Sequence, residues 1–166
     1  PLHKNDIIEL AITATSSEGM GIGRYEGVAV FVAHAAQGDL LKVRIVKLMK
    51  NFVFGKIEEI LVSSPDRIEQ DCPVAPRCGG CVFRHISYKK ELEIKRDRVE
   101  QAFSRIGGLE IETLPVIGAQ YPDRYRNKAQ YPVGIEDGML KIGFYSPRSH
   151  RINHCLDCLL QPENFQ

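Results

Sequence analysis

Residues 39–62, "DLLKVRIVKLMKNFVFGKIEEILV", carry the pattern from which the first half of the fold is predicted. In the first part of this stretch, apolar residues alternate with Lys42 and Arg44, and a period of two is typical of a half-buried β-strand. The second part, "FVFGKIEEILV", indicates a further pair of strands bent at Gly55. The stretch therefore predicts a sheet with one apolar face and one basic face.

The segments before this stretch are also predicted to be β-strands. "IIELAIT" (7–13) alternates, and "EGVAVFVA" (26–33) is typical of a more buried strand. Between them the three glycines of "SSEGMGIGR" (16–24) are expected to break the chain in a turn. Five short strands within residues 1–65 favour a small, all-β, closed barrel of the OB type, because closure removes the exposed edges of so short a sheet.

The polar face of this predicted barrel combines cations with aromatic rings. The candidates for nucleic-acid contact are Lys42, Arg44, Lys47, Lys50 and Phe52. OB-type barrels bind nucleic acid with such residues, because cations follow the phosphates and rings stack on the bases. A solvated edge strand with phenylalanines in the core fits the same residues, so the pattern alone leaves both interpretations open.

Residues 63–70, "SSPDRIEQ", are polar and contain a proline, and they mark the predicted boundary between a first domain at 1–65 and a second at 66–166. The second domain is basic in two places. Residues 84–105 hold seven Lys/Arg against four Asp/Glu, and residues 121–151 hold six against three. This charge favours a polyanionic partner, although solvated surface helices carry similar charge.

The second domain is expected to be an incomplete α+β domain. An α-helix is predicted to begin after Ser87, which serves as N-cap, and to end at the Gly107-Gly108 pair. Its charged face is interpreted as solvated, with RNA contact as the alternative. β-Structure is predicted over "RYRNKAQYPV" (124–133) and beyond the hairpin turn at Asp137-Gly138.

A cysteine-rich loop opens the second domain. "DCPVAPRCGGCVFRH" (71–85) places Cys72, Cys78 and Cys81 within ten residues, among prolines and glycines that exclude a helix or a central strand. Thiols gathered in this way, in a chain with an odd total of five cysteines, indicate a metal centre in a reducing compartment rather than a disulfide framework.

The position of the other two cysteines bears on the kind of centre. The fourth ligand has to come from far along the chain, at Cys155 or Cys158. Three clustered cysteines with one distant partner are a common ligation pattern of 4Fe–4S clusters. A structural zinc site typically uses two C-x-x-C pairs about 15–20 residues apart. Here the pairs 78/81 and 155/158 lie more than 70 residues apart and Cys72 is left over, so the spacing favours the cluster and leaves zinc as the alternative.

Composition excludes several classes of protein. The chain has 166 residues, a formal net charge of +1 and 43% hydrophobic residues, as in ordinary globular domains. Its longest apolar run, "VAVFVA" (28–33), is far shorter than the roughly 20 residues that span a bilayer, so no membrane partner is expected. No secretory signal is recognisable. We expect a cytoplasmic, monomeric protein and, because the sequence begins at Pro1, a fragment of a longer one.

Along nearly its whole length the sequence resembles the N-terminal part of the RumA-like RNA (uracil-5-)-methyltransferases. The resemblance is carried by "GMGIGRYEGVAVFV" and "GDLLKVRI", which look like the TRAM module, and by "CPVAPRCGGCVFRHISYKKELEIKRDRVEQAFSRIGG". The stretches "YRNKAQYPV" and "IGFYSPRSHRINHCLDCLLQ" complete it. The cysteine loop joined to the following helix is its most specific part.

The resemblance implies a 4Fe–4S cluster and further RNA contacts. The implied cluster ligands are Cys72, Cys78, Cys81 and Cys158. The implied RNA-binding residues are Arg126, Lys128, Arg148 and His150, for which a basic outer strand face is the alternative interpretation. Cys155 departs from the family pattern, and it is open whether it is a spare thiol, an alternative ligand or a cause of loading with zinc.

Members of this family transfer a methyl group from S-adenosylmethionine to carbon 5 of a uridine, which has to be extruded from its stack. The resemblance places the methyl-donor domain and the catalytic cysteine C-terminal to the part matched here. We therefore expect no catalytic and no S-adenosylmethionine-binding residue in this chain, and no activity of the fragment alone. The expected partner is structured RNA, namely 23S ribosomal RNA. The alternative function is a stand-alone TRAM and zinc protein that binds RNA without catalysis.

Overall fold

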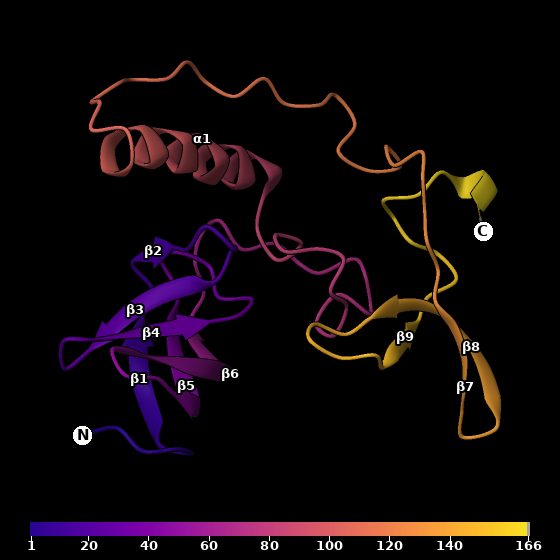
Figure 1. Ribbon diagram of the computed structural model, residues 1–166, viewed down its shortest axis with the longest axis horizontal. Coiled ribbons are helices and arrows are strands. Elements are labelled where there is room, and N and C mark those ends of the chain that lie inside the picture. Colours follow the sequence, from indigo (N-terminus) through magenta and orange to yellow (C-terminus); the bar gives the residue numbers. More distant parts are fainter. Residues whose placement is uncertain (166) are drawn as a thin grey trace. The chain divides into compact units, whose positions relative to one another are not determined.

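The computed structural model describes residues 1–165, which are mostly β-structure with one α-helix (Figure 1). The chain divides into two compact units: unit 1 comprises Pro1–Glu69 and His85–Val116, and unit 2 comprises Gln70–Arg84 and the chain from Ile117 onward. The expected division at residue 65 differs from this one, because the cysteine loop groups with the C-terminal segment and the helix with the N-terminal strands. Nowhere in residues 1–165 is a helix both long and apolar enough to cross a membrane.

Unit 1 is built on one six-stranded sheet with the strand order β1-β5-β6-β4-β3-β2. Neighbouring strands are antiparallel except for β4 and β6, which run in parallel. The strands are β1 (Ile7–Ala11), β2 (Ala14–Thr15), β3 (Gly21–Tyr25), β4 (Val28–Val32), β5 (Leu40–Leu48) and β6 (Phe52–Val62).

The core of unit 1 follows from the predicted alternation. Leu41, Val43 and Ile45 of β5 are fully buried, and the register places Leu10 opposite Leu41 and Ile8 opposite Val43. Each such side chain stabilises the fold by about 1.5–3 kcal/mol relative to an exposed position. The predicted strands of residues 7–13 and 39–50 are thereby confirmed in their main part.

The sheet is not closed, so the predicted closed barrel is wrong. In the described part of the chain, β1 and β2 lie at the two ends of the strand order and do not pair. The sheet instead coils so that the end of β1 approaches β3: a Cβ added to Gly23 would lie 2.4 Å from the carbonyl oxygen of Ala11, and one added to Gly21 would lie 2.7 Å from Cβ of Ala35. These two glycines belong to strand β3 rather than to the predicted turn. Glycine is required at both positions because the close approach leaves no room for a side chain.

β6 is one continuous strand rather than the predicted pair bent at Gly55. Its first residues pair with β4, and from Val53 to Val62 it pairs with β5. The irregularity lies in the β5–β6 register, which shifts at three places, one of them between Ile45 and Lys47. Gly55 is required for a different reason, since a Cβ there would lie 2.2 Å from Cγ1 of the buried Val43.

The segment predicted as a linker is fastened to the sheet through Asp39, whose side chain is fully buried. Its carboxylate accepts hydrogen bonds from the guanidinium of Arg67 at 2.5 Å and from the backbone N–H groups of Ser64 at 2.9 Å and Ala36 at 2.7 Å. Burial by itself would raise the pKa of Asp39, but these hydrogen bonds and the Arg67 charge outweigh burial and lower the pKa. Asp39 therefore stays ionised and ties residues 64–67 to the sheet.

The helix α1 (Tyr88–Arg105) confirms the predicted helix. The hydroxyl of Ser87 accepts the N–H of the first turn at 3.2 Å, and after the helix Gly108 takes a left-handed φ of 64°. No side chain of α1 is buried. Val99 and Phe103 of its predicted apolar face are 46% and 42% exposed. The helix is therefore stabilised by its N-cap and by surface ion pairs rather than by a buried apolar face.

Unit 2 contains a three-stranded antiparallel sheet in the order β7-β8-β9. Its elements are β7 (Val133–Glu136), β8 (Met139–Tyr145), β9 (Ile152–His154) and the short 3-10 helix η1 (Glu163–Phe165). The predicted hairpin turn is confirmed, with φ of 53° at Asp137 and 74° at Gly138. The strand predicted over 124–133 is wrong except for its last residue, Val133.

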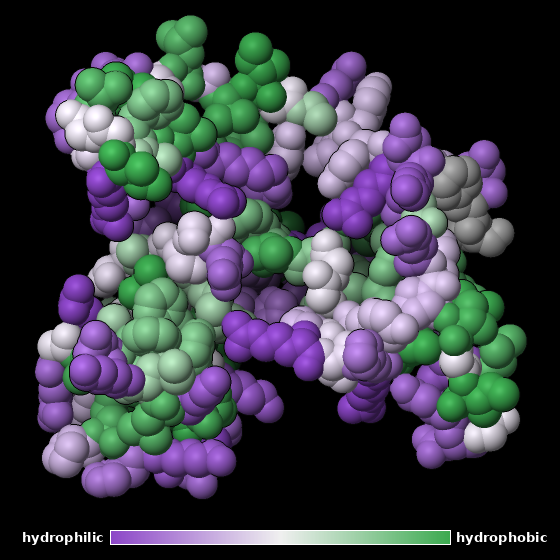
Figure 2. Space-filling model, in the orientation of Figure 1, coloured by the Kyte–Doolittle hydropathy of each residue, from purple (hydrophilic) through white to green (hydrophobic). Residues whose placement is uncertain are grey.

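The β7–β8 hairpin exposes an apolar surface. Figure 2 shows apolar side chains gathered over this hairpin, and the exposed ones are Val133, Ile135, Met139 and Leu140, at 61–75%. Because both strands expose apolar residues, the hairpin gains its order from backbone pairing rather than from burial of both faces.

Candidate metal centre and nucleic-acid interface

In unit 2 the cysteine loop, residues 70–84, is fastened to the β8–β9 region. The amide of the buried Asn153 donates to the carbonyl of Arg77, 76 residues earlier, at 2.9 Å. The N–H of Gly79 donates to the carbonyl of Tyr145 at 3.0 Å. A Cβ on Gly79 would lie only 3.1 Å from that oxygen, which explains a glycine at this position. Two distant segments are thereby held side by side.

All five cysteines line one small cavity at this junction. Its wall is made by Cys72, Cys78, Cys81, Cys155 and Cys158, together with Val74, Ala75, Gly80, Arg84, Arg126, Phe144, Leu159 and Leu160. The cavity volume is about 30 Å³. One water molecule needs about 10–15 Å³ on this measure, so the cavity has room for a small inorganic group and not for an organic cofactor.

The thiols of this cavity do not stand at metal-coordinating distances as they are. No group of three or more His, Cys, Asp or Glu side chains within residues 1–165 has the geometry of a metal site. Burial, and after it the neighbouring thiols, raise the pKa of Cys81 and of Cys155 to about 11. Both are therefore protonated at neutral pH. Metal binding would require the side chains to turn into the cavity and release protons, which a bound cation promotes.

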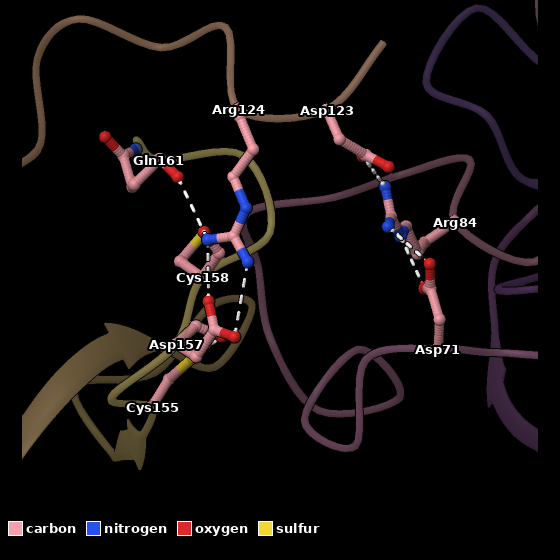
Figure 3. Close-up of polar contacts among 8 residues, drawn as sticks. All are labelled: Asp71, Arg84, Asp123, Arg124, Cys155, Asp157, Cys158 and Gln161. Atoms are coloured by element: carbon pink, nitrogen blue, oxygen red, sulfur yellow. Dashed lines mark hydrogen bonds and ion pairs between the residues drawn. The ribbon is translucent and has the colours of Figure 1, made fainter. Parts of the chain in front are cut away.

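Two arginines, Arg84 and Arg126, stand in the same wall. Figure 3 shows Arg84 between two carboxylates: its guanidinium donates to Asp71 at 2.6 and 2.8 Å and to Asp123 at 2.5 Å. The charges of both arginines lower the pKa of Cys81 against the larger effect of burial. Because two carboxylates balance the charge of Arg84, the positive charge that remains beside the thiols of the wall is that of Arg126.

Arg124 fixes the turn that carries the second pair of cysteines. Its guanidinium donates to the carboxylate of Asp157 at 2.7 Å and to the carbonyls of Cys158 at 3.3 Å and Gln161 at 3.1 Å (Figure 3). The backbone N–H of Arg124 also donates to the carbonyl of Leu159 at 2.8 Å. Residues 155–161 are therefore held in place independently of any metal.

The predictions from sequence did not include Arg84 or Arg124. Their carboxylate partners lie 13, 39 and 33 residues away, so no local periodicity points to them. One signal was available: Asp71 directly precedes Cys72 and Asp157 directly precedes Cys158, so that each of these carboxylates adjoins a predicted ligand.

The predicted RNA contacts of unit 1 fall into two groups. Lys42 and Arg44 each pair with a glutamate of β6 at 2.7 Å, so their charges are balanced within the sheet. Lys47 and Lys50 are exposed, and neither takes part in any of the ion pairs found among the described residues. Among these four predicted residues, the charges that no ion pair balances therefore lie at the end of β5 and in the turn after it.

Phe52 belongs to an aromatic cluster on the face of the sheet opposite the core. Its ring centroid lies 5.3 Å from that of Phe31 and 5.4 Å from that of Phe54, in edge-to-face arrangements. All three rings are half-buried, whereas Val30 and Val53, which alternate with them, lie in the core. The cluster offers ring edges next to the strand that carries Lys47, with which Phe54 is paired in register.

The predicted RNA contacts of unit 2 are spread over two places. Arg126 lines the cysteine cavity, and Lys128 is exposed two residues later. Arg148 and His150 line an open groove of about 610 Å³ together with Tyr145, whose ring centroid lies 5.4 Å from that of His150. The groove combines a cation with two aromatic rings, a combination with which proteins bind the phosphates and bases of single-stranded nucleic acid.

Comparison with known proteins adds a family match and named relatives. Residues 1–57 match the TRAM domain. The chain is 42% identical over 163 residues to a Clostridium tetani protein named as an uncharacterized RNA methyltransferase. This alignment covers 98% of this chain and 35% of the relative. The chain is also 42% identical over 164 residues to a protein of the same name from Halalkalibacterium halodurans, covering 98% and 36%. The chain thus spans about a third of the length of these relatives.

A solved structure supports the fold. The Pyrococcus abyssi tRNA (uracil-54, C5)-methyltransferase, determined in complex with S-adenosyl-L-homocysteine, aligns with 94% of this chain and 33% of its own length. The TM-score is 0.58 and the identity 23%, so this likeness concerns the fold alone. The structure is thus mostly β with one helix, and its first part, residues 1–57, matches the TRAM domain.

Proposed function

We propose that this chain is the RNA-binding, cluster-bearing N-terminal portion of an S-adenosylmethionine-dependent RNA uridine-5 methyltransferase that acts as a monomer in the cytoplasm. The observation that carries the proposal is the gathering of five thiols around one cavity in a chain whose residues 1–57 match the TRAM domain. The names of the relatives, and the reaction named for the structural neighbour, support methyl transfer as the reaction class. Binding of the methyl donor and catalysis are assigned to the part of the protein outside this chain.

The inorganic centre of this proposal is a 4Fe–4S cluster bound by Cys72, Cys78, Cys81 and Cys158. The thiol donor set of the cavity and the positive charge of Arg126 in its wall suit such a group. The backbone N–H of Gly80 already donates to Sγ of Cys78 at 3.3 Å, an interaction that favours the ionised thiolate. When bound, the cluster supplies a covalent link between residues 72–81 and residue 158, and so closes a long loop and stiffens unit 2.

The proposed substrate is structured 23S ribosomal RNA with an accessible loop. Single-stranded loops present unstacked bases to aromatic side chains and phosphates to cations. Lys47, Lys50 and the Phe52 cluster provide this combination on unit 1, and Lys128, Arg148 and His150 provide it on unit 2. Lys42 and Arg44 are assigned a smaller part, because carboxylates already balance their charges. Arg126 is assigned chiefly to the cavity that it lines.

RNA binding by unit 1 is tested by reversing the charge of both exposed lysines, Lys47→Glu with Lys50→Glu. Each lost phosphate contact lowers the slope of log K against log salt by about 0.7 for single-stranded RNA, so the double variant is expected to lose roughly 1.4 of the slope. The measurement is a titration of a fluorescently labelled ribosomal RNA hairpin at several salt concentrations.

The matched control is Lys89→Glu with Arg98→Glu, which changes the net charge by the same amount at exposed positions of α1. The control is expected to keep most of the slope. Equal loss in both double variants would contradict a specific role of the Lys47/Lys50 face, because net charge or contact by α1 would explain it. An unchanged slope in the Lys47/Lys50 variant would remove this face from the interface.

A further inference from the structure

The cavity holds one thiol more than a four-ligand centre uses. The proposed cluster uses four of the five thiols as ligands, and Cys155 is not among them, although it lies in the same wall. Cys155 and Cys158 form a C-x-x-C pair, as Cys78 and Cys81 do. Two such pairs around one point are the usual ligand set of a structural Zn²⁺ site, with Zn–S distances of about 2.3 Å.

The backbone places Cys155 for this role independently of any cluster. Its N–H donates to the carbonyl of Ile142 at 3.0 Å, which fixes it at the end of β9. Three residues later Cys158 is fixed by the bonds from Arg124 to its carbonyl and to Asp157 (Figure 3). Both thiols of this pair therefore come from a single, firmly held turn, as Figure 3 shows.

The thiol of Cys155 donates a hydrogen bond to its own turn rather than to Cys72, Cys78 or Cys81 of the cysteine loop. Its Sγ donates a hydrogen bond to the carbonyl of Asp157 at 3.3 Å, a weak contact that a bound cation can replace. Cys155 lines the same cavity as the thiols of both segments, Cys72, Cys78, Cys81 and Cys158.

We propose that the cavity has two alternative ligand sets, one for each kind of metal centre. Cys72, Cys78, Cys81 and Cys158 hold the iron–sulfur cluster of the proposed function, on which this half of the proposal rests. Cys78, Cys81, Cys155 and Cys158 hold a single Zn²⁺ ion. Cys72 is exchanged for Cys155 when zinc replaces the cluster. Arg126, which lines the same wall, offsets part of the negative charge that four thiolates leave on a divalent ion.

The proposal is tested by the zinc affinity of Cys155→Ser and Cys72→Ser in the whole chain. Metal-free protein is titrated anaerobically with Zn²⁺ in competition with a chromophoric chelator. Removing a residue that only hydrogen-bonds to a metal ligand costs about 10–100-fold in metal affinity. Removing a ligand itself costs more, so Cys155→Ser is expected to lower the Zn²⁺ affinity by more than about 100-fold. Cys72→Ser is expected to stay within about threefold of the parent chain. Equal losses, or a larger loss in Cys72→Ser, would overturn the second ligand set.

The same two variants are then reconstituted with iron and sulfide. Cys155→Ser is expected to take up the cluster and Cys72→Ser to lose it, the reverse of the zinc result. If the parent chain takes up no iron, the cluster assignment of the proposed function fails, while the zinc comparison still decides the second ligand set.

A measurement on the parent chain avoids any folding defect of the variants. In the zinc-loaded protein, brief treatment with iodoacetamide followed by mass spectrometry is expected to modify Cys72 and to leave Cys155 protected. Modification of Cys155 with protection of Cys72 would contradict the proposal.

Discussion

His85 is a buried titratable residue of unit 1 whose pKa is strongly lowered. It is 3% exposed, and its ring lies edge-on to that of His34 with centroids 5.8 Å apart. Nδ1 of His85 has no hydrogen-bond partner in the described part of the chain. Burial, followed by the charge of Arg67, lowers the pKa of His85 from 6.5 to about 4. The neutral imidazole is therefore the form that fits the fold.

This pKa predicts how the stability of unit 1 depends on pH. Because the folded pKa lies below the unfolded one, the unfolded chain binds the proton first, and stability is lost as pH falls from about 6.5 toward 4. The full loss is on the order of 3 kcal/mol, at about 1.4 kcal/mol per pKa unit. Hydrogen exchange of the β5 amides between pH 7 and pH 5 covers the upper part of this range, where a loss of about 2 kcal/mol is expected.

His85→Gln is expected to remove most of this pH dependence, although the variant is itself less stable. His3→Gln is the matched control, because the side chain of His3 is 73% exposed. A protein whose β5 amides keep the same opening free energy from pH 7 to pH 5 would contradict the assignment of a buried neutral imidazole.

Single residues were predictable from the sequence where their partners are local. Ser87 was recognised as N-cap because the N–H that it accepts lies three residues away. The three clustered cysteines were recognised in the same way. By contrast, the ion pair of Arg84 with Asp123 joins residues 39 apart, and no pattern in the sequence distinguishes this arginine from a solvated one.

At the level of elements, Gly23 decides how the sheet of unit 1 coils. The approach of β1 to β3 leaves no space at this position, and the nearest atom is a backbone oxygen, which cannot turn aside as a side chain can. Gly23→Ala is therefore expected to destabilise unit 1 by about 1–3 kcal/mol, as overpacked cores generally are. The β5 amides, followed by hydrogen exchange, report the change.

The control for this substitution is Gly27→Asn. Gly27 has a φ of 84°, which Asn tolerates better than other side chains, and an added Cβ would meet no atom within 4 Å. It is expected to cost less than about 1 kcal/mol. If both variants were equally stable, the close contact between β1 and β3 would not be a determinant of the fold.

Elements were predicted where side chains alternate and missed where they do not. β5 shows its alternation directly, because Leu41 and Val43 face the core while Lys42 faces away. β3 was taken for a turn, because the glycines that permit its close approach leave no apolar alternation to read. The open sheet was not predicted either, since the parallel pairing of β4 with β6 depends on contacts far apart in the sequence.

At the scale of the whole molecule, the order of the chain does not follow the order of the units. Residues 70–84 leave unit 1 for unit 2, residues 85–116 return to unit 1, and the chain from 117 onward completes unit 2. Composition predicts a single boundary at residue 65, whereas tertiary contacts group residues 70–84 with the chain from 117 onward, and composition carries no signal for such grouping. This interleaving is what brings all five thiols into one unit.

The central claim is that thiols from both segments of unit 2 hold one inorganic centre. Cys78 is the most buried of the five cysteines, at 8% exposure, and belongs to both proposed ligand sets. The most direct test is the iron and acid-labile sulfide content of the parent chain and of Cys78→Ser after anaerobic reconstitution. The account predicts equal amounts of iron and sulfide in the parent chain and almost none in the variant. Iron and sulfide retained in full by Cys78→Ser, or absent from the parent chain, would contradict it.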